Sequence, residues 1–297
     1  MEKLLVIGAG GLLGGRAFEL GKGRFEVFGT YNFHPVKGEK MFQMDVTKRQ
    51  EVFRIIEKIK PNIIIDTHAL HPVDYCETHP EETWNITVNG TKNVAEASKR
   101  VGAKYVFFST DYVFDGKRLS YTEKDKPNPL NYYGKTKWAA EMVLEALGVN
   151  HIVARAAVLY GMGGHGKVSF VSWVIEALRK GEKINIVTDQ HNNPTFADNL
   201  IQIVFKLYEK DSEGLFHITG KECLSRYDFA KHIAKVFGLN SKLIVPITTP
   251  DLGQISTRPE KINISTKKVE RISGIKTMGI DEGLKTLKMQ LEENKSD

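Results

Sequence analysis

Hydrophobic residues in the first half of the chain fall into two alternating kinds of segment. Short, nearly continuous apolar runs predict strands at 4–7, 25–31, 40–44, 63–65 and 105–109. Longer segments with apolar residues at helical spacing predict helices at 12–20, 47–60 and 78–100. Strands and helices that alternate in this way predict a doubly wound α/β fold, in which right-handed crossovers build a parallel, Rossmann-like sheet.

Capping boxes, in which Ser or Thr is followed three residues later by an acidic or amide side chain, predict where helices begin. Such pairs stand at Thr47 and Gln50, Thr78 and Glu81, Thr195 and Asp198, and Ser225 and Asp228. The second half is less regular, with helices predicted at 131–146 and 168–179, strands at 152–156 and 215–219, and a polar tail at 292–297 that is expected to fray. We therefore expect residues 1–160 to form one domain, to which 196–220 returns, and 161–297 to form mainly a smaller, interleaved lobe.

Composition and charge narrow the class of protein. The 297 residues are 41% hydrophobic and 26% charged, which is typical of a globular protein, and the net charge is +6. The basic residues are dispersed, so no nucleic-acid-binding patch is predicted. Two cysteines fit a reducing compartment, no apolar stretch approaches the roughly 18 residues of a membrane span, and the first strand leaves no room for a signal peptide. We expect a cytoplasmic protein that binds neither nucleic acid nor membrane.

A glycine-rich loop from Gly8 to Gly14 joins the first predicted strand to the first predicted helix. In this context Gly8 permits a tight turn, Gly11 lets a pyrophosphate approach the backbone, and Gly14 lets the helix pack on the strand. A tight turn without a ligand is the alternative. The flanking strand and helix favour dinucleotide binding, so residues 1–160 are predicted to be a dinucleotide-binding domain.

The second predicted strand ends at Tyr31-Asn32, without the carboxylate that would hold the ribose hydroxyls of NADH. NADPH is therefore the favoured cofactor, with NADH as the alternative. Arg16 and Lys37 are candidates to meet the 2′-phosphate, and Asp45 stands where a carboxylate reaches the adenine amino group.

A second constellation carries acid–base chemistry. Tyr133 and Lys137 are four residues apart, on one face of a predicted helix, and Thr110 ends the fifth predicted strand. A neighbouring ammonium and an oxidised nicotinamide are expected to lower the tyrosine pKa from its ordinary value of about 10. A Tyr-x-x-x-Lys pair also occurs on solvated helices, but the glycine loop and the strand-terminal threonine favour catalysis.

With these motifs the chain resembles the extended short-chain dehydrogenase/reductase superfamily, and within it the dTDP-4-dehydrorhamnose reductase family. That family also contains the regulatory β subunit of methionine adenosyltransferase. The resemblance covers nearly the whole chain and rests on the glycine loop, on the segments 109–116 (STDYVFDG) and 129–137 (PLNYYGKTK), and on matches at Arg155, 159–161, 193–195 and 258–259.

The resemblance implies a role for each matching residue. The catalytic residues would be Thr110, Tyr133 and Lys137. The cofactor contacts, with those predicted above, would be Gly8, Gly11, Leu12, Leu13, Gly14, Tyr31, Asn32, Asp45, Val46, His68, Ala69, Leu70, Tyr133 and Lys137. Substrate would contact Thr110 and Asp111, and Arg258 is either a clamp for a diphosphate or a surface arginine before a turn proline.

Two features depart from the family pattern. Val158 stands where members that act on the rhamnose precursor often carry an aromatic residue, and Thr67-His68-Ala69 replaces a run of small alanines. The histidines, cysteine and carboxylate that follow the fourth strand also resemble a metal loop (His68, His71, Asp74, Cys76 and His79). Their irregular spacing favours a loop that lines the cofactor, so no metal is predicted.

The expected function is an NAD(P)H-dependent oxidoreductase that reduces a nucleotide-linked 4-keto sugar, with dTDP-4-dehydrorhamnose and its product dTDP-rhamnose as the leading pair. Residues 161–297 would mainly bind this substrate, and a homodimer is compatible with the sequence. One alternative is a regulatory subunit that binds NADP without catalysis. Another is a nucleotide-sugar epimerase or dehydratase, but Thr110-Asp111 is followed by Tyr112 rather than by a second acid, which disfavours elimination of water.

Overall fold

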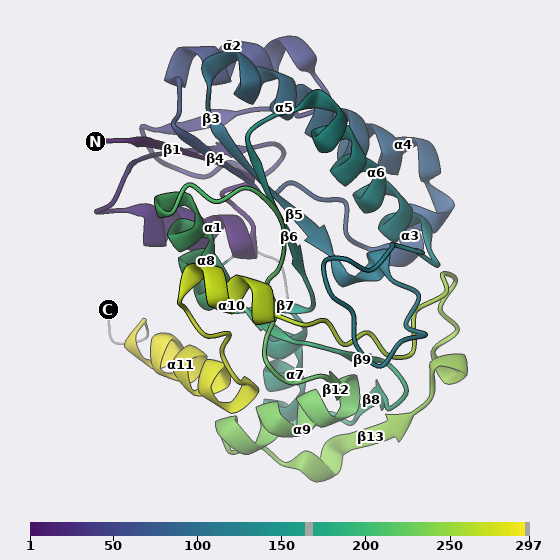
Figure 1. Cartoon of the computed structure of the whole chain (residues 1–297). Coiled ribbons are helices and arrows are strands. Elements are labelled where there is room, and N and C mark those ends of the chain that lie inside the picture. The colour runs from purple at the N-terminus through teal and green to yellow at the C-terminus, as the bar shows by residue number, and fades with distance from the viewer. Residues whose placement is uncertain (164–168, 295–297) are drawn as a thin grey trace.

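The structure is a computed structural model and describes residues 1–163 and 169–294. Its centre is a parallel sheet with the strand order β11-β6-β5-β4-β1-β2-β3 (Figure 1). The strands are β1 (Lys3–Ile7), β2 (Glu26–Tyr31), β3 (Met41–Gln43), β4 (Ile63–Asp66), β5 (Lys104–Thr110), β6 (His151–Ala156) and β11 (Gly214–His217). Because the chain moves outward on both sides of β1, the sheet has a topological switch point there, and the predicted doubly wound fold is confirmed.

Helices cover both faces of this sheet because its strands alternate apolar side chains between two cores. Leu4 and Val6 of β1 face the core built by α1 (Leu12–Gly21) and α8 (Ala197–Glu209). Leu5 and Ile7 face the opposite core, which α2 (Arg49–Ile59), α5 (Gly90–Val101) and α6 (Tyr132–Leu147) complete. Both layers are visible in Figure 1, with the short α10 (Lys267–Ser273) beside α8.

The second lobe lies below the carboxyl ends of the strands in Figure 1. It packs α7 (Phe170–Arg179), α9 (Arg226–Phe237) and α11 (Ile280–Glu293) around the parallel pair β8 (Ile184–Val187) and β13 (Ile244–Ile247). Shorter elements join the lobes: α3 (Val73–Thr78), α4 (Pro80–Trp84), η1 (Asn85–Asn89), η2 (Asp111–Val113), β7 (Leu159–Tyr160), β9 (His191–Asn192), β10 (Thr195–Phe196), β12 (Leu224–Ser225), η3 (Ser241–Leu243) and η4 (Thr249–Leu252). The chain crosses between lobes more than once, since β11 pairs with β6 in the central sheet.

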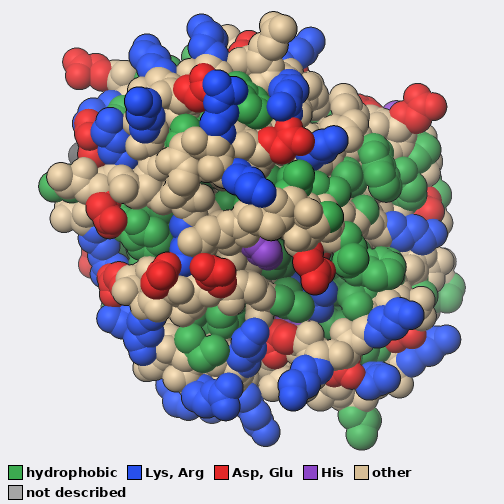
Figure 2. Space-filling model, turned by 45° about the horizontal axis from the view of Figure 1, so that its top comes forward, with side chains coloured by type: hydrophobic (Ala, Val, Ile, Leu, Met, Phe, Trp, Pro, Cys, Tyr) green, Lys and Arg blue, Asp and Glu red, His purple; other side chains and the backbone are tan. Residues whose placement is uncertain are grey.

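Short strands form both edges of the sheet. The strand β3 has three residues and β11 has four. At the β11 edge the Lys268 ammonium of α10 donates a hydrogen bond of 2.5 Å to the Leu215 carbonyl oxygen. On the face shown in Figure 2, Lys and Arg side chains are interspersed with Asp and Glu. Within the described residues, no helix combines the length and hydrophobicity needed to cross a bilayer.

Three of the four predicted capping boxes are wrong. The Thr47 hydroxyl donates to Asp45 instead, and α2 begins at Arg49. The Thr195 hydroxyl donates to the Asn193 carbonyl, and Phe196 caps α8 without a side-chain bond. Only at α9 does the predicted cap form, where the Ser225 oxygen accepts from the backbone N–H of Asp228 at 3.0 Å and its hydroxyl donates to the Asp228 carboxylate at 2.7 Å.

The helix predicted at 78–100 is divided. The Thr78 hydroxyl donates to the Asp74 and Tyr75 carbonyls within α3, and the chain restarts at Pro80 as α4. The π-helical turn η1 then inserts an extra residue before α5. Further along, the predicted start at Val168 lies outside the described residues, and the tail expected to fray from 292 remains helical through Glu293, with 295–297 also undescribed.

Candidate active site

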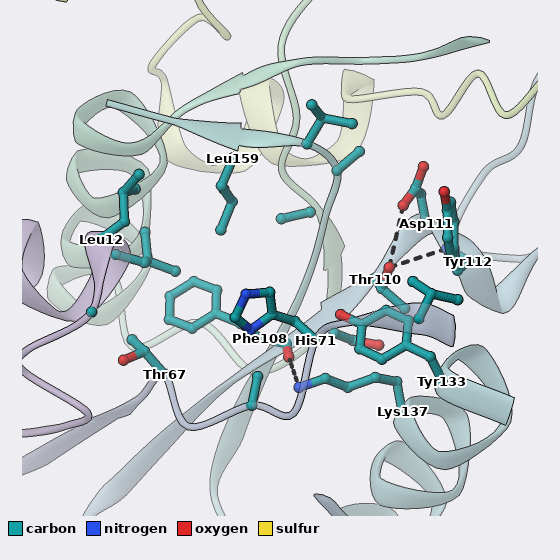
Figure 3. A pocket seen from close by; sticks show the side chains of 18 of the residues that line it. Leu12, Thr67, His71, Phe108, Thr110, Asp111, Tyr112, Tyr133, Lys137 and Leu159 are labelled. Atoms are coloured by element: carbon teal, nitrogen blue, oxygen red, sulfur yellow. Dashed lines mark hydrogen bonds between the residues drawn. The ribbon is translucent and has the colours of Figure 1, made fainter. Parts of the chain in front are cut away.

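A cavity of about 460 Å³ opens at the carboxyl ends of β1, β4, β5 and β6, where open α/β sheets bind their ligands (Figure 3). Its wall comes from the glycine loop, the segments that follow β4, β5 and β6, the start of α6, and the second lobe. The lining residues are Gly11, Leu12, Leu13, Thr67, His68, Ala69, His71, Val73, Phe108, Ser109, Thr110, Asp111, Tyr112, Tyr133, Lys137, Ala156, Ala157, Val158, Leu159, Ser169, Phe170 and Arg226.

The glycine loop brings the start of α1 to this wall. Gly8 has a φ of +81°, a backbone conformation that favours glycine. A Cβ on Gly14 would lie only 2.2 Å from the Gly8 carbonyl oxygen, so a glycine at position 14 lets the helix pack closely against the turn. No side chain caps the helix at Gly11. The backbone N–H groups of its first turn are therefore available to an anion, and this N-terminus fits the pyrophosphate of a dinucleotide.

The three predicted catalytic residues meet in the cavity. Thr110 ends β5, and Tyr133 and Lys137 lie one turn apart on α6, with the Tyr133 hydroxyl directed into the cavity (Figure 3). The buried Lys137 ammonium donates a hydrogen bond of 2.9 Å to the Phe108 carbonyl oxygen. Burial lowers the pKa of Lys137 to about 8.

The pKa of Tyr133 is raised, not lowered as the sequence predicts for this side chain. Burial is the main cause, and a hydrogen bond with Thr110 acts in the opposite direction. The Lys137 ammonium is held by the Phe108 backbone carbonyl. In this structure the phenol is thus a firmly protonated group.

The start of α6 fixes Tyr133 beside the end of β5. The Asn131 side chain caps the helix by accepting from the Gly134 N–H at 2.9 Å, and its amide donates to the Thr257 carbonyl at 3.0 Å. A Cβ on Gly134 would lie 2.2 Å from the Tyr112 carbonyl oxygen. This contact presses the first turn of α6 against the segment that carries Thr110.

Asp111 is a buried carboxyl in the same wall. It accepts hydrogen bonds from the Thr110 hydroxyl at 3.2 Å and from the Asn192 amide at 2.5 Å. Burial raises its pKa to about 6, and the two hydrogen bonds only partly oppose that rise.

His68 lines the cavity from the segment after β4 and is held from behind. Its Nδ1 lies 2.6 Å from Asp66, and its Nε2 lies 3.1 Å from the Ile86 carbonyl oxygen. Tyr105 also donates to Asp66, at 2.5 Å. Although burial would raise the pKa of Asp66, its contacts with His68 and Tyr105 hold that pKa below the ordinary value. These supports were not identified from the sequence.

The other members of the histidine-rich segment have separate partners. Asp74 pairs with Arg258, the Cys76 thiol donates to the Leu70 carbonyl, and the His79 ring stacks on Tyr75. Across residues 1–163 and 169–294, no three His, Cys, Asp or Glu side chains are grouped so that they could hold a metal ion.

Several predicted cofactor residues lie beyond the cavity wall, along the ends of β2 and β3. Asp45 is bound by the Thr47 hydroxyl at 2.7 Å, and the Val46 carbonyl accepts from Asn93 at 2.9 Å. The other predicted residues that do not line the cavity are Gly8, Gly14, Tyr31, Asn32, Leu70 and Arg258.

Two predicted phosphate-binding arginines already have carboxylate partners. Arg16 donates two hydrogen bonds to Asp198, at 2.6 and 2.7 Å, and Arg258 donates to Asp74 at 2.5 Å and to the Ser256 carbonyl at 2.7 Å. Of the two candidates for a 2′-phosphate, only Lys37 is exposed.

The second lobe contributes wall residues that the sequence analysis did not identify. They are Ser169, Phe170 and Arg226. The Ser225–Asp228 capping box placed Arg226 at the start of a helix, but nothing local indicated that this helix faces the glycine loop. Val158, another residue of the wall, has a φ of +41°, an outlier for a β-branched residue.

Comparisons with known proteins agree over nearly the whole chain. The profile of the RmlD substrate binding domain matches residues 1–292. A dTDP-4-dehydrorhamnose reductase from Aggregatibacter actinomycetemcomitans is 31% identical over 98% of this chain and 100% of its own length. The methionine adenosyltransferase 2 subunit beta of Bos taurus is 30% identical over 95% of this chain and 87% of its own. A crystal structure of dTDP-4-dehydrorhamnose reductase from Bacillus anthracis in complex with NADP superposes with a TM-score of 0.87, at 30% identity, and covers 97% of this chain and 99% of that one.

Proposed function

Because the chain belongs to the RmlD substrate-binding-domain family, that of the dTDP-4-dehydrorhamnose reductases, we propose that it is an NADPH-dependent reductase of a nucleotide-linked 4-keto sugar. The observation that most supports this proposal is the meeting of Thr110, Tyr133 and Lys137 with an uncapped helix N-terminus in one cavity. The cytoplasm is the compartment we propose for this reaction.

In this mechanism the chain binds the carbonyl and supplies a proton. The nicotinamide, when bound, supplies a hydride to the keto carbon. The Thr110 hydroxyl holds the carbonyl oxygen, and the Tyr133 hydroxyl gives its proton to that oxygen as negative charge develops. The raised pKa of Tyr133 keeps this proton in place at neutral pH before the reaction. Lys137 would hold the ribose, and Tyr133 regains its proton from solvent.

The glycine loop and the ends of β2 and β3 would bind the rest of the cofactor. The first turn of α1 would take the pyrophosphate, and Asp45 and Val46 would face the adenine. NADPH is preferred because no carboxylate ends β2 and because the exposed Lys37 lies in the loop that follows. The NADP complex of the Bacillus anthracis relative supports this choice.

The specific substrate that we propose is dTDP-4-dehydrorhamnose, which would lie between the sheet and the second lobe. This follows from the name of the Aggregatibacter relative and from the part that α7 and α9 take in the cavity wall. The test is NADPH oxidation with a panel of dTDP- and UDP-linked 4-keto sugars. Turnover of at least one supports the reductase, whereas failure with every member of the panel contradicts it.

One second candidate has a specific observation in its favour. Because the chain is similar to methionine adenosyltransferase 2 subunit beta, the second candidate is a regulatory subunit that binds NADP without catalysis. The chain would then co-purify with a methionine adenosyltransferase and change that enzyme's activity. Tagged full-length chain, recovered from its own cells with and without the Tyr133→Phe substitution, separates the two: a regulatory role survives that change and reduction does not.

A further inference from the structure

Arg226, the first residue of α9, extends into the cavity wall from the second lobe. Its backbone N–H donates to the Gln190 carbonyl at 3.0 Å, which fixes the start of the helix. Its guanidinium carbon lies 5.4 Å from the centre of the Phe170 ring, and the side chain is half-buried. The guanidinium thus lies against an aromatic face.

That arrangement differs from the other buried or nearly buried arginines. Arg16, Arg155 and Arg258 each form an ion pair, with Asp198, Glu141 and Asp74 respectively. Within the described ranges Arg226 forms no such ion pair, although its charge lowers the pKa of the neighbouring Asp111 carboxyl. Desolvating a guanidinium fork without a carboxylate is unfavourable unless something else accepts its hydrogen bonds.

The surroundings of Arg226 point to a ligand. Figure 3 shows the Asp111 carboxyl and the Tyr112 hydroxyl directed to the same side, away from Lys137. Burial raises the pKa of Tyr112, and the Arg226 charge and its contact with the hydroxyl oppose that rise, so the arginine faces this pair. The Arg226 charge also lowers the pKa of Asp111, whose carboxyl accepts hydrogen bonds from Asn192 and Thr110. A guanidinium carries several N–H donors, so contact with the Tyr112 hydroxyl leaves others for a group inside the cavity.

We propose that Arg226 binds the phosphate next to the sugar in a nucleoside-diphosphate substrate and so determines which substrates bind. A guanidinium fork matches two phosphate oxygens, and an arginine without a carboxylate partner keeps both donors for them. The inference rests on the proposed reductase function. It assigns to Arg226 the contact that the sequence left open for Arg258, which donates to Asp74 and to the Ser256 carbonyl.

The position of the cavity's reactive groups favours a phosphate over a sugar carboxylate. Thr110 and Tyr133 would hold the 4-keto oxygen from the sheet side of the cavity. In a hexose the anomeric carbon lies across the ring from carbon 4, so the attached phosphate points away from the sheet. Arg226 enters from α9, which lies on that far side (Figure 1).

Calorimetric titration of the full-length chain, saturated with NADP⁺, tests the proposal. The probes are dTDP and UDP, with thymidine and uridine as uncharged counterparts. Arg226→Gln is expected to weaken binding of both diphosphates about 10- to 100-fold, as loss of a charge-assisted hydrogen bond does, with little effect on the nucleosides. Arg226→Lys keeps the charge without the fork and should fall between the two.

The matched control is Arg179→Gln, at the exposed far end of α7, which should bind every probe as the unchanged protein does. Equal affinity of Arg226→Gln for the diphosphates, or an equal loss for diphosphates and nucleosides, overturns the inference. Titration of Arg226→Gln with UDP-glucose and UDP-glucuronate tests which anion Arg226 contacts. A loss of affinity confined to UDP-glucuronate would place the contact on the sugar carboxylate and overturn the phosphate assignment.

The result is distinguishable from failure of the proposed function. If the unchanged protein reduces a nucleotide sugar and Arg226→Gln does so with the same KM, the reductase stands and the inference is wrong. If no sugar is reduced but dTDP or UDP binding depends on Arg226, the inference stands and the reductase proposal is wrong.

Discussion

Burial holds the reactive side chains of the cavity in protonation states that suit a reduction. It raises the pKa of Tyr133, which therefore keeps the proton that an alkoxide needs, and lowers that of Lys137 to about 8. Asp111, one residue beyond Thr110, has a pKa of about 6 for the same reason. The site thus resembles a proton donor at rest more than a preformed phenolate.

Tyr133→Phe removes one oxygen and keeps the ring, so we expect folding and NADPH affinity to change little. Loss of a positioned acid should reduce turnover roughly 10²- to 10⁴-fold. Lys137→Met should instead lower both turnover and NADPH affinity, because its ammonium is assigned to the ribose as well. Steady-state kinetics and NADPH fluorescence titration measure both quantities, and unchanged turnover in Tyr133→Phe would remove that residue from the mechanism.

The Asp111 carboxyl should make stability depend on pH. Its pKa is raised from 3.8 to about 6 on folding, so the folded state binds the proton more tightly than the unfolded chain does. This contribution is complete below pH 3.8 and is lost as pH rises to about 6, and it amounts to roughly 3 kcal/mol. The Asp111→Asn variant lacks this pH-dependent contribution to stability.

Urea unfolding of the two proteins at pH 4 and pH 7 measures the effect. The free energy of unfolding of Asp111→Asn, relative to that of the unchanged protein, should increase by roughly 2–3 kcal/mol from the lower to the higher pH. Parallel pH profiles would mean that Asp111 is not a buried titrating group.

At the scale of elements, the glycine loop combines a packing role and a binding role that two substitutions separate. A Cβ on Gly14 would lie 2.2 Å from the Gly8 carbonyl oxygen, whereas one on Gly11 would meet that oxygen at an ordinary 3.4 Å. Gly14→Ala should therefore lower the free energy of unfolding by about 1–3 kcal/mol as the helix is displaced. Gly11→Ala should fold normally and bind NADPH more weakly, because its methyl group occupies the approach to the helix N-terminus.

Denaturant unfolding and NADPH titration of both variants distinguish the roles. Normal NADPH affinity in Gly11→Ala would show that the pyrophosphate does not approach the backbone at that residue. Normal stability in Gly14→Ala would show that the loop and the helix can separate without cost.

The elements that the sequence predicted well are those whose signal is local. The strands β1, β4 and β5 at the centre of the sheet are buried, largely apolar runs, and the continuous β4 and β5 required helices on both faces. The capping boxes failed where another partner took a side chain. The Thr47, Thr78 and Thr195 hydroxyls bond to residues close by in the sequence, and Asp198 pairs with Arg16, 182 positions away. Spacing within one segment carries no information about such a partner.

The same limit explains which residues of the candidate site the sequence identified and which it missed. Thr110, Tyr133 and Lys137 were predicted because a strand end and one helical turn bring them together. Arg226 was missed because only the packing of α9 against the rest of the second lobe turns it toward the cavity. The roles of all these residues stay predictions.

At the scale of the whole molecule, Asp198 links three elements. Its carboxylate accepts two hydrogen bonds from Arg16 of α1 and one, at 2.7 Å, from Gln290 of α11. Both ends of the ion pair are nearly buried. Asp198 itself belongs to α8, so the sheet's helical layer and the second lobe share one carboxylate.

Asp198→Ala should therefore destabilise both lobes together, because it leaves the Arg16 charge buried without a partner. We expect a loss of about 3–5 kcal/mol, in one cooperative transition detected by both circular dichroism and tryptophan fluorescence. Glu209→Ala, which removes exposed ion pairs with Arg24 and Lys206, is the control and should cost under about 1 kcal/mol. A loss in the Asp198 variant no larger than that of Glu209→Ala would contradict this role of the shared carboxylate.

The short edge strands of the central sheet affect how readily the folded protein aggregates at high concentration. An unpaired strand edge is a template onto which another chain can add a strand, and this addition is how many proteins form fibrils. Here β3 offers three residues, and at β11 Lys268 already occupies the Leu215 carbonyl. The edges thus offer few free backbone groups with which a strand of another chain could pair. The folded protein should therefore stay free of amyloid-like aggregates even in concentrated solution.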